Sequence, residues 1–497
     1  MSAVRDLSTP ESTSRRTQVA DALSRAFKRG KVLVDREALK PYECDGLSAY
    51  RESPLLAALP ADEDEVAAVL EVARQWSVPV VARGSGTGLS GGALPLADGI
   101  LMSMAKFSRI VEVDALARRA RVQPGVTNLK ISQVAAPLGL YYAPDPSSQI
   151  ACSIGGNVAE NSGGVHCLKY GLTVHNIAKV RAITIDGDVA DLGSEALDSA
   201  GYDLLALVTG SEGLLAVTLE VTVKLLPRPE MAQVVMASFR DVGSAGDAVA
   251  NVIGAGIVPA GLEMMDKLAT RAVEDFVHAG YDLEAEAILL AESDGSREEV
   301  AEEVAKIIEV MRASGATDIR CSADELQRLK FWSGRKAAFP AVGRISPDYY
   351  CIDGSIPRGA LARVLARTGE MSEKYRLRCA NVFHAGDGNL HPLILYDANV
   401  PGELERTEEF AAELLELCIE VGGTITGEHG VGIEKINQMC SQFTREELAQ
   451  FHAVKAAFDP HGLLNPGKAV PTLHRCAEYG AMRVKGGALP HPDLPRF

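Results

Sequence analysis

The sequence predicts an α+β protein of two domains, and three observations support this prediction. Its 497 residues exceed what one hydrophobic core usually organises. Glycine-rich segments gather between residues 83 and 213, whereas long helical patterns alternate with strand patterns after about residue 230. We therefore expect a leader over residues 1–50, a first domain over 51–230, a second domain over 231–470 and an extended tail over 471–497.

In the first domain, a helix is predicted by "DEDEVAAVLEVARQW", where Val66, Val69, Leu70 and Ala73 recur at helical spacing behind an acidic first turn. A short β-branched run, "VPVV", then leads directly into glycine. Near the end of the domain, "GLLAVTLEVTVKLLP" alternates like a half-buried strand and stops at Pro227.

In the second domain, strands are predicted by "AQVVMASF" and "EAILLAES". Long helices are predicted by "EEVAEEVAKIIEVMRASG" and "ELERTEEFAAELLELCIEVGG", and both patterns end in glycine, a common helix stop. Helices interleaved with strands favour an α+β arrangement here.

Composition excludes several classes of protein. A net charge of −16 argues against nucleic acid as a main partner, because phosphate would be repelled. No window approaches eighteen uninterrupted apolar residues, so no transmembrane helix is expected, and the N-terminus lacks an apolar signal core, which predicts the cytoplasm. The cysteines include no Cys-x-x-Cys, so an iron–sulfur cluster is not expected in this chain.

The segment "RGSGTGLSGG" follows the first predicted strand with five glycines in ten residues. Gly86, Gly88 and Gly91 match the dinucleotide fingerprint, but that motif needs a helix directly after the glycines, and Pro95 and Gly99 disfavour one. Open backbone N–H groups can still cradle phosphate. We therefore predict a phosphate-binding loop without the Rossmann helix; the alternative is a merely flexible loop.

Two further small-residue segments follow, "APDPSSQIACSIGGNVAENSGGVHCLKYG" and "TGSEGLLAV". Backbone of this kind suits close contact with a large flat ligand. In this order, the three segments resemble the FAD-binding domain of the vanillyl-alcohol-oxidase/PCMH superfamily of flavoproteins. The resemblance implies a PCMH-type fold. It also implies FAD, held non-covalently, since the first loop has Ser85 and Thr87 where covalent members carry a histidine.

The resemblance assigns cofactor-binding residues to all three regions. The first loop would hold the pyrophosphate, and the "PDPSS" and "GGNVAENSGG" segments would line the isoalloxazine and ribityl parts. The residues implied are Arg83, Gly84, Ser85, Gly86, Thr87, Gly88, Leu89, Ser90, Gly91, Pro144, Asp145, Ser148, Gly155, Gly156, Asn157, Gly164 and, close to the flavin, Asn465.

Two short motifs in the second domain, "VFHAGDGNLHPLI" and "GTITGEHGVG", hold three of the ten histidines. Two histidines and a carboxylate are ligands suited to Zn²⁺, Mn²⁺ or Fe²⁺ with open positions left for substrate. The alternative is that these are polar turn residues.

The second domain resembles the FAD-linked oxidase C-terminal domain of D-2-hydroxy-acid dehydrogenases, with its helices and antiparallel sheet. The resemblance implies that His384, His391 and Glu428 bind a divalent metal, that Asn389 is a nearby polar contact and that His429 is the catalytic base.

A substrate carboxylate also needs a cation. In "FWSGRKAAFP", Arg335 could bind the carboxylate through two parallel hydrogen bonds; the alternative is a surface arginine. Some relatives add a lysine where this chain has Cys351, which disfavours a diacid.

Segments such as "PYECDGLSAYR", "DYYCIDGSIPR" and "FHAVKAAFDPHGLLNPGK" resemble the flavoprotein subunits of bacterial glycolate oxidases, relatives of D-lactate and D-2-hydroxyglutarate dehydrogenases. The function implied is oxidation of a small 2-hydroxy acid, glycolate and also D-lactate, by hydride transfer to FAD. A stand-alone D-lactate dehydrogenase is the alternative, and a non-enzymatic flavin- or metal-binding module a third.

The same resemblance implies a second flavin-type subunit and an iron–sulfur subunit, through which the chain would sit peripherally at the inner membrane. The tail from His474 to Phe497 is a candidate docking strip, the alternative being a tail folded onto its own domain.

Overall fold

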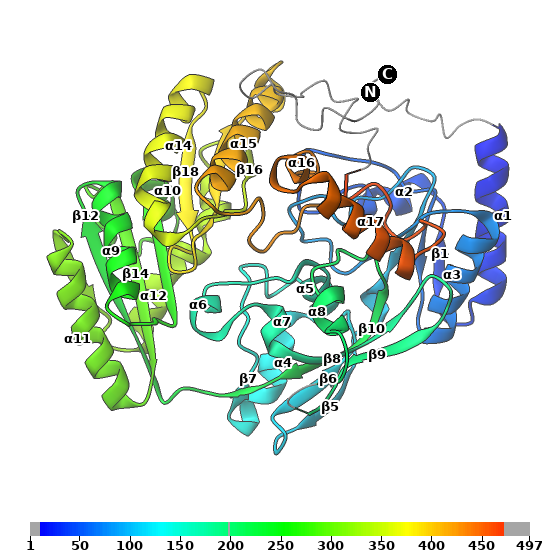
Figure 1. Ribbon diagram of the computed structural model, residues 1–497, viewed down its shortest axis with the longest axis horizontal. Helices are drawn as coiled ribbons and strands as arrows, with labels where there is room; N and C mark the ends of the chain where they lie inside the picture. The colour runs from blue at the N-terminus through cyan, green and yellow to red at the C-terminus, as the bar shows by residue number, and fades with distance from the viewer. Residues whose placement is uncertain (1–9, 197–198, 472–497) are drawn as a thin grey trace.

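The chain folds into two lobes in this computed structural model, which describes residues 10–196 and 199–471. The first lobe holds a four-stranded and a five-stranded sheet, and the second lobe holds a seven-stranded sheet (Figure 1). The candidate docking strip from His474 to Phe497 lies outside the described residues.

The four-stranded sheet of the first lobe has the order β1 (Lys31–Leu33), β2 (Leu56–Leu59), β4 (Ile100–Ser103), β3 (Val80–Arg83). β2, β4 and β3 run parallel, while β1 joins the edge antiparallel. Two helices pack beside it: α1 (Pro10–Ala26), in the expected leader, and α3 (Glu63–Trp76), the helix predicted from its spacing. Asp62 caps α3 by accepting the backbone N–H of Glu65, which fixes where the helix begins.

The five-stranded sheet of the first lobe is antiparallel, with the order β5 (Ile110–Asp114), β6 (Arg119–Val122), β10 (Val217–Lys224), β8 (Ile177–Ile183), β9 (Val189–Gly193). Short helices lie beside it: α4 (Asn128–Ala135), α5 (Ile154–Glu160), α7 (Thr173–Asn176) and α8 (Leu204–Val208). A further short helix, α6 (Cys167–Tyr170), contacts β13 (Gly261–Asp266) of the second lobe. β10 is the half-buried strand that the alternating pattern predicts. A two-stranded pair, β7 (Leu140–Tyr141) with β11 (Leu226–Pro227), closes this lobe.

The seven-stranded sheet of the second lobe is antiparallel throughout, in the order β15 (Asp318–Cys321), β12 (Met231–Phe239), β14 (Ala287–Gly295), β13 (Gly261–Asp266), β18 (Cys379–Phe383), β20 (Pro392–Tyr396), β16 (Asp348–Cys351). On β12, Val235 and Ala237 belong to one core and Val234 and Met236 to another. Because both faces of this strand are buried, it reads as a continuous apolar run.

Helices cover both faces of that sheet. One core contains residues of α9 (Val242–Gly254), α11 (Arg297–Ala313), α14 (Leu361–Tyr375) and α15 (Glu403–Glu420), and the other contains residues of α10 (Lys267–Val277), α12 (Glu325–Lys336) and α13 (Ala338–Val342). The two long helices predicted to end at glycine are α11 and α15, and Gly315 and Gly422 follow them with positive φ. The expectation of an α+β protein is confirmed.

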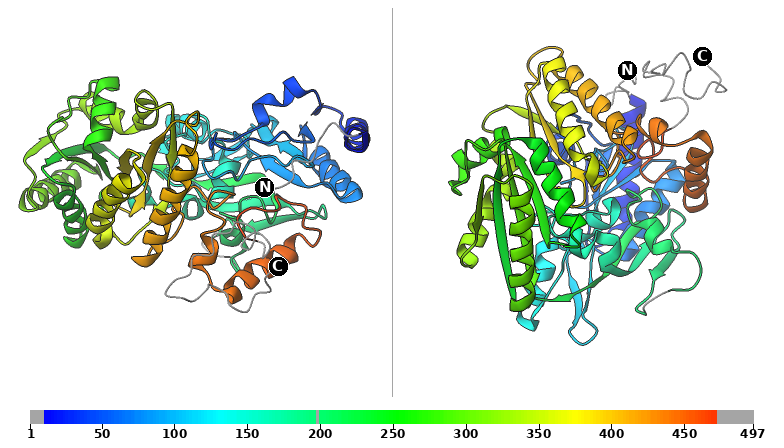
Figure 2. Two further views of the ribbon diagram at one scale, coloured as in Figure 1. Left: turned by 90° about the horizontal axis from the view of Figure 1, so that it is seen from above. Right: turned by 60° about the vertical axis from the view of Figure 1, so that its left-hand side comes forward.

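The last part of the chain returns to the first lobe (Figures 1 and 2). After α16 (Met439–Gln442) and α17 (Arg445–Phe458), Leu464 forms a parallel bridge with Val80 of β3. Val80 donates its N–H to Leu463 O at 2.8 Å and accepts that of Asn465 at 2.8 Å. The expected domain boundaries remain a prediction, and the structure adds that the C-terminal residues complete the first lobe's sheet.

None of the helices in the described ranges combines the length and apolar character needed to cross a bilayer.

Candidate functional site

A cavity of about 370 Å³ brings together the glycine loop, the second small-residue segment and the histidine motifs. The glycine loop leaves the end of β3, and over Gly84–Gly99 the chain forms no helix, so the rejection of a Rossmann motif is confirmed. His391, Glu428 and His429 belong to the wall of the same cavity. The predicted cofactor residues that line it are Arg83, Gly84, Ser85, Gly86, Thr87, Gly88, Leu89, Ser148, Gly155, Gly156 and Asn157.

The other predicted cofactor residues do not line the cavity, and four of them make hydrogen bonds to neighbouring segments. Asp145 accepts the N–H of His166, and Pro144 O accepts the side-chain amide of Asn128. Asn465 donates to Gly92 O at 3.0 Å and to Glu212 O at 2.7 Å. Ser90 donates its hydroxyl to His429 O at 2.9 Å, and Gly91 and Gly164 have positive φ. These residues shape the loops from outside the cavity.

The wall fits a cofactor that carries phosphate. A Cβ at Gly88 would meet nothing within 4 Å, so the backbone there is open to a ligand. Gly86 has φ +70°, a conformation that favours glycine. The hydroxyl of Ser153, in the wall beside Gly84, is buried and has no hydrogen-bond partner among the described residues. An open loop backbone and an unused hydroxyl are what a phosphate would need.

The two histidines of the first motif bracket a turn between β18 and β20. His384 donates its N–H to Asn389 O at 3.1 Å, and Gly388 donates to His384 O at 3.1 Å. Gly388 has φ +84°, and a Cβ there would lie 2.1 Å from Ile356 O. The chain therefore crosses itself tightly enough to bring the rings of His384 and His391 to a centroid distance of 5.1 Å.

His384, His391 and Glu428 each offer a ligand atom, and these atoms lie within 4.8 Å of one another. Glu428 Oε1 is 3.3 Å from His384 Nε2 and 3.0 Å from His391 Nε2. Burial alone raises the pKa of Glu428, but the two histidines outweigh burial and lower it well below its ordinary value. Glu428 therefore stays ionised, and two imidazoles with a carboxylate are a donor set that fits Zn²⁺, Mn²⁺ or Fe²⁺.

Glu263, on β13, supports this group from behind. Its Oε1 is 2.8 Å from His384 Nδ1, which leaves His384 Nε2 facing Glu428. Its Oε2 accepts a hydrogen bond from Arg335 Nε at 2.7 Å, and both side chains of this ion pair are 1 % exposed. Burial alone raises the pKa of Glu263, but His384 and Arg335 outweigh burial and lower it. Fixing the second ring nitrogen in this way is typical of metal-binding histidines.

Arg335 is therefore buried and paired, and in the described part of the chain it is not among the residues that line the cavity. Its Nη2 is buried without a hydrogen-bond partner in the described ranges, so one edge of the guanidinium is unused. Lys336, the next residue, is exposed and does line the cavity. The substrate-binding role of Arg335 stays a prediction, and Lys336 is a second cation that the sequence did not single out.

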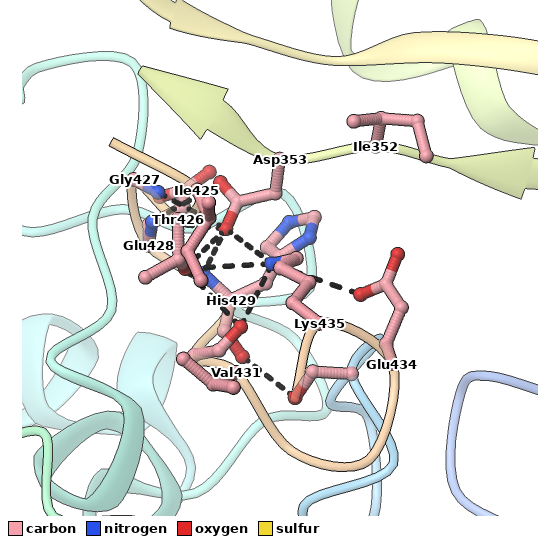
Figure 3. Close-up of polar contacts among 12 residues, drawn as sticks. Ile352, Asp353, Ile425, Thr426, Gly427, Glu428, His429, Val431, Glu434 and Lys435 are labelled. Atoms are coloured by element: carbon pink, nitrogen blue, oxygen red, sulfur yellow. Dashed lines mark hydrogen bonds and ion pairs between the residues drawn. The ribbon is translucent and has the colours of Figure 1, made fainter. Parts of the chain in front are cut away.

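Asp353 fixes the turn that carries Glu428 and His429. It follows β16, is fully buried, and its carboxylate accepts the N–H of Glu428 at 3.1 Å and that of His429 at 2.9 Å. It also accepts the hydroxyl of Thr426 at 2.6 Å and the ammonium of Lys435 at 3.0 Å. Figure 3 shows this carboxylate between the backbone of the turn and Lys435. Its Oδ2 accepts both the N–H of His429 and the ammonium of Lys435.

His429 lies against His391, with ring centroids 4.8 Å apart and planes inclined by 12°. Burial lowers the pKa of His429 to about 4, so the ring is neutral at pH 7 and able to accept a proton. Asn389, 6 % exposed, lies against Gly427, where a Cβ would be 2.3 Å from Asn389 Oδ1. Asn389 thus contacts the turn that precedes Glu428.

Two residues of the first lobe, Ser90 and Glu212, make hydrogen bonds to the loop that follows His429. Ser90 of the glycine loop donates to His429 O, as described above, and its own carbonyl accepts the N–H of Ile433 at 3.0 Å. Glu212 of the third small-residue segment accepts the N–H groups of Val431 and Gly432, both at 2.7 Å. The loop that follows His429 is therefore held by the first lobe.

Sequence reasoning missed Glu263, Asp353, Glu212 and Lys435. A signal existed for two of them: Glu263 is an acidic residue inside the apolar strand "GLEMMD", and Asp353 follows the apolar run "YYCI". A buried carboxylate is expected only where donors surround it. Nothing in the sequence showed which donors those were.

The chain matches two family models: "FAD binding domain" over residues 54–193 and "FAD linked oxidases, C-terminal domain" over residues 228–469. It is 62% identical over 482 residues to the glycolate oxidase subunit GlcD of Escherichia coli strain K12, covering 97% of both chains. It is 34% identical to a D-lactate dehydrogenase of Archaeoglobus fulgidus, covering 83% of this chain and 91% of the relative.

Among solved structures, p-cresol methylhydroxylase with substrate bound superposes with a TM-score of 0.79 at 17% identity, covering 93% of this chain and 98% of that one. At this identity the likeness concerns the fold, and it confirms the expected two-domain PCMH-type architecture.

Replacing Asp353 by Asn should destabilise the folded protein by about 3–5 kcal/mol, because the buried Lys435 loses the nearer of its two carboxylates, at 3.0 Å, and keeps only Glu434 at 3.6 Å. Urea unfolding followed by intrinsic fluorescence measures this loss. The double variant Asp353→Asn, Lys435→Met removes both charges and should recover part of it. A free energy of unfolding for Asp353→Asn within about 0.5 kcal/mol of the parent would contradict this account of the turn.

Proposed function

We propose that this chain, a member of the FAD-linked oxidase family, oxidises a small 2-hydroxy acid to the 2-oxo acid, with glycolate as the main substrate and D-lactate as a second one. The similarity to a glycolate oxidase subunit and to a D-lactate dehydrogenase supports this substrate class. One observation carries the proposal: the cavity lined by the FAD-binding loops also has His391, Glu428 and His429 in its wall.

His384, His391 and Glu428 are the residues that would hold a divalent cation, since they provide the donor set described above. A cation there supplies charge stabilisation to the substrate hydroxyl and carboxylate, and FAD supplies the hydride acceptor. Glu263 orients His384 through its Nδ1, and Asp353 orients Glu428 through the backbone. We infer that FAD is bound non-covalently, because Ser85 and Thr87 stand in the glycine loop where a linking histidine would be needed.

His429 is the proposed base. Its ring is neutral at pH 7, it lines the cavity, and its Nδ1 is buried without a hydrogen-bond partner among the described residues. Removing the hydroxyl proton at a ring nitrogen contributes typically about 10²–10⁴-fold to such reactions. Asn389 is proposed as a polar contact that keeps the turn before Glu428 in place.

Replacing His384 by Ala should lower turnover of glycolate by at least about 100-fold while FAD stays bound, because the histidine lies outside the wall formed by the FAD loops. The assay uses purified protein loaded with one metal at a time and an artificial dye as electron acceptor. Acid precipitation should release the flavin from parent and variant alike, which checks both occupancy and non-covalent binding.

Two outcomes of that experiment would refute the proposal. One is full activity in protein shown to be metal-free by elemental analysis. The other is turnover of neither glycolate nor D-lactate by metal-replete protein. A preference for D-lactate, with full coupling to the membrane by the chain alone, would favour the second candidate, a stand-alone D-lactate dehydrogenase.

Arg335→Lys should raise KM for the 2-hydroxy acid by about 10-fold or more, since lysine can replace the charge that pairs with Glu263 but has no second nitrogen in the position of Nη2 to bind a carboxylate. The unused Nη2 of Arg335 motivates this expectation. Lys336→Ala is the matched variant, one residue away on the cavity wall. A raised KM in Lys336→Ala with an unchanged KM in Arg335→Lys would move the carboxylate contact to Lys336.

We further propose that the chain works with a second flavin-type subunit and an iron–sulfur subunit, peripheral to the inner membrane on its cytoplasmic side. The support is the similarity to a protein named as a glycolate oxidase subunit. The isolated chain should reduce its own FAD and an artificial dye, and should pass electrons to membranes only when the partner subunits are added. Coupling of the lone chain to membrane quinone at the full rate would refute this.

A further inference from the structure

Cys351 lies beside the candidate metal site and has no role in the chemistry proposed above. It is the last residue of β16, which pairs antiparallel with β20 so that Cys351 stands opposite Leu393. His391 is two residues before Leu393, so it falls on the same face of the sheet as a diagonal neighbour of Cys351. The thiol is free and 4 % exposed.

Cys351, His391 and His429 form a second group of potential ligands. One ligand atom from each of the three lies within 4.8 Å of the others, as close as in the group of His384, His391 and Glu428. The two groups share only His391. The stacking of His391 on His429 sets two imidazole rings side by side next to the thiol.

Two buried ring nitrogens in this second group are unused. His391 directs Nε2 to Glu428, and its Nδ1 is buried without a hydrogen-bond partner in the described part of the chain. His429 Nδ1 is likewise buried and has no hydrogen-bond partner among the described residues. Buried polar atoms are generally hydrogen-bonded, so two unpartnered ring nitrogens within this group are contacts that a ligand could complete.

We propose that Cys351, His391 and His429 form a second cation site for a thiophilic divalent ion of the Zn²⁺ or Cd²⁺ class. A thiol with two imidazoles is a softer donor set than two imidazoles with a carboxylate, and it selects such ions over Mn²⁺ or Mg²⁺. The thiol proton leaves to solvent when the ion binds, because the thiolate is the ligand.

Filling this site inhibits the enzyme, and this part of the inference rests on the proposed function. An ion held by His429 occupies the nitrogen lone pair that the base uses, and an ion held by His391 competes for a ligand of the first site. The same metal that supports turnover at one equivalent therefore inhibits it in excess when the metal is zinc.

Binding is tested directly on the full-length protein with its FAD, independently of turnover. Cd²⁺ is titrated in, and the ultraviolet absorption of the cadmium–thiolate bond is measured. The parent should show an absorption change that saturates at one ion per chain. Cys351→Ser should abolish that change. Cys321→Ser is the matched control, because Cys321 lies on β15, at the opposite edge of the same sheet, and it should leave the change intact.

His429→Gln is the second binding variant. It keeps the thiol but removes one imidazole, and it should weaken Cd²⁺ by about 10–100-fold. An equal absorption change in parent and Cys351→Ser, or unchanged affinity in His429→Gln, would overturn the proposed site.

Inhibition is tested on protein loaded first with Mn²⁺. Added Zn²⁺ should inhibit the parent, and Cys351→Ser should need about 10-fold more Zn²⁺ for the same fractional inhibition, each protein being compared with its own rate without Zn²⁺. If the proposed function is wrong, no protein turns over glycolate but the cadmium absorption still depends on Cys351. If the second site is wrong, turnover persists and the dependence on Cys351 is absent.

Discussion

The carboxylate of Asp353 is the point on which the rest of the site depends. An ionised carboxylate only accepts hydrogen bonds, and this one accepts backbone N–H groups from the turn of Gly427, Glu428 and His429. Without it, these buried N–H groups would have no acceptor there. Lys435 adds a positive charge in the same place. Burial alone raises the pKa of Asp353, but Lys435 together with His429 and His391 outweighs burial and lowers it, so the group stays ionised. The backbone of Glu428 and of His429 is held by this one carboxylate.

The site is assembled by segments that are far apart along the chain, and each contact fixes one of them. Glu263 on β13 holds His384, Ser90 holds the turn of His429 from the glycine loop, and Glu212 holds the residues after it. The FAD-binding loops and the histidine motifs therefore share one rigid wall although they belong to different lobes. Such a wall keeps an oriented ligand at a fixed distance from the cofactor, which is the condition for transfer between two bound molecules.

Much of this could be predicted from the sequence. The glycine loop, α3, α11 and α15 follow from local patterns, and Pro95 correctly argues against a Rossmann helix. The histidine motifs mark the second part of the site because imidazoles, a carboxylate and tight glycine turns occur together.

The environment of Arg335 could not be predicted, since its ion-pair partner Glu263 precedes it by about 70 residues and lies on another element. The sequence also could not show that Lys336, and not Arg335, lines the cavity. Which side of α12 faces the cavity depends on tertiary packing. The return of the C-terminal residues to β3 has no local signal either.

That return has a consequence for how the protein is made. The first lobe contains most of the sequence that is synthesised early, and β3 pairs there with β4. The other edge of β3 is bridged only when Leu464 is available, and Asn465 ties together Gly92 and Glu212, two residues of the cavity wall. A nascent chain that has not yet reached Leu464 has an open edge at β3 and lacks the hydrogen bonds that join Gly92 to Glu212. Completion of the flavin-binding lobe thus waits for residues that are synthesised after the sheet of the second lobe, and a chain that ends soon after the glycine-rich segments also lacks His391, Glu428 and His429 from the cavity wall.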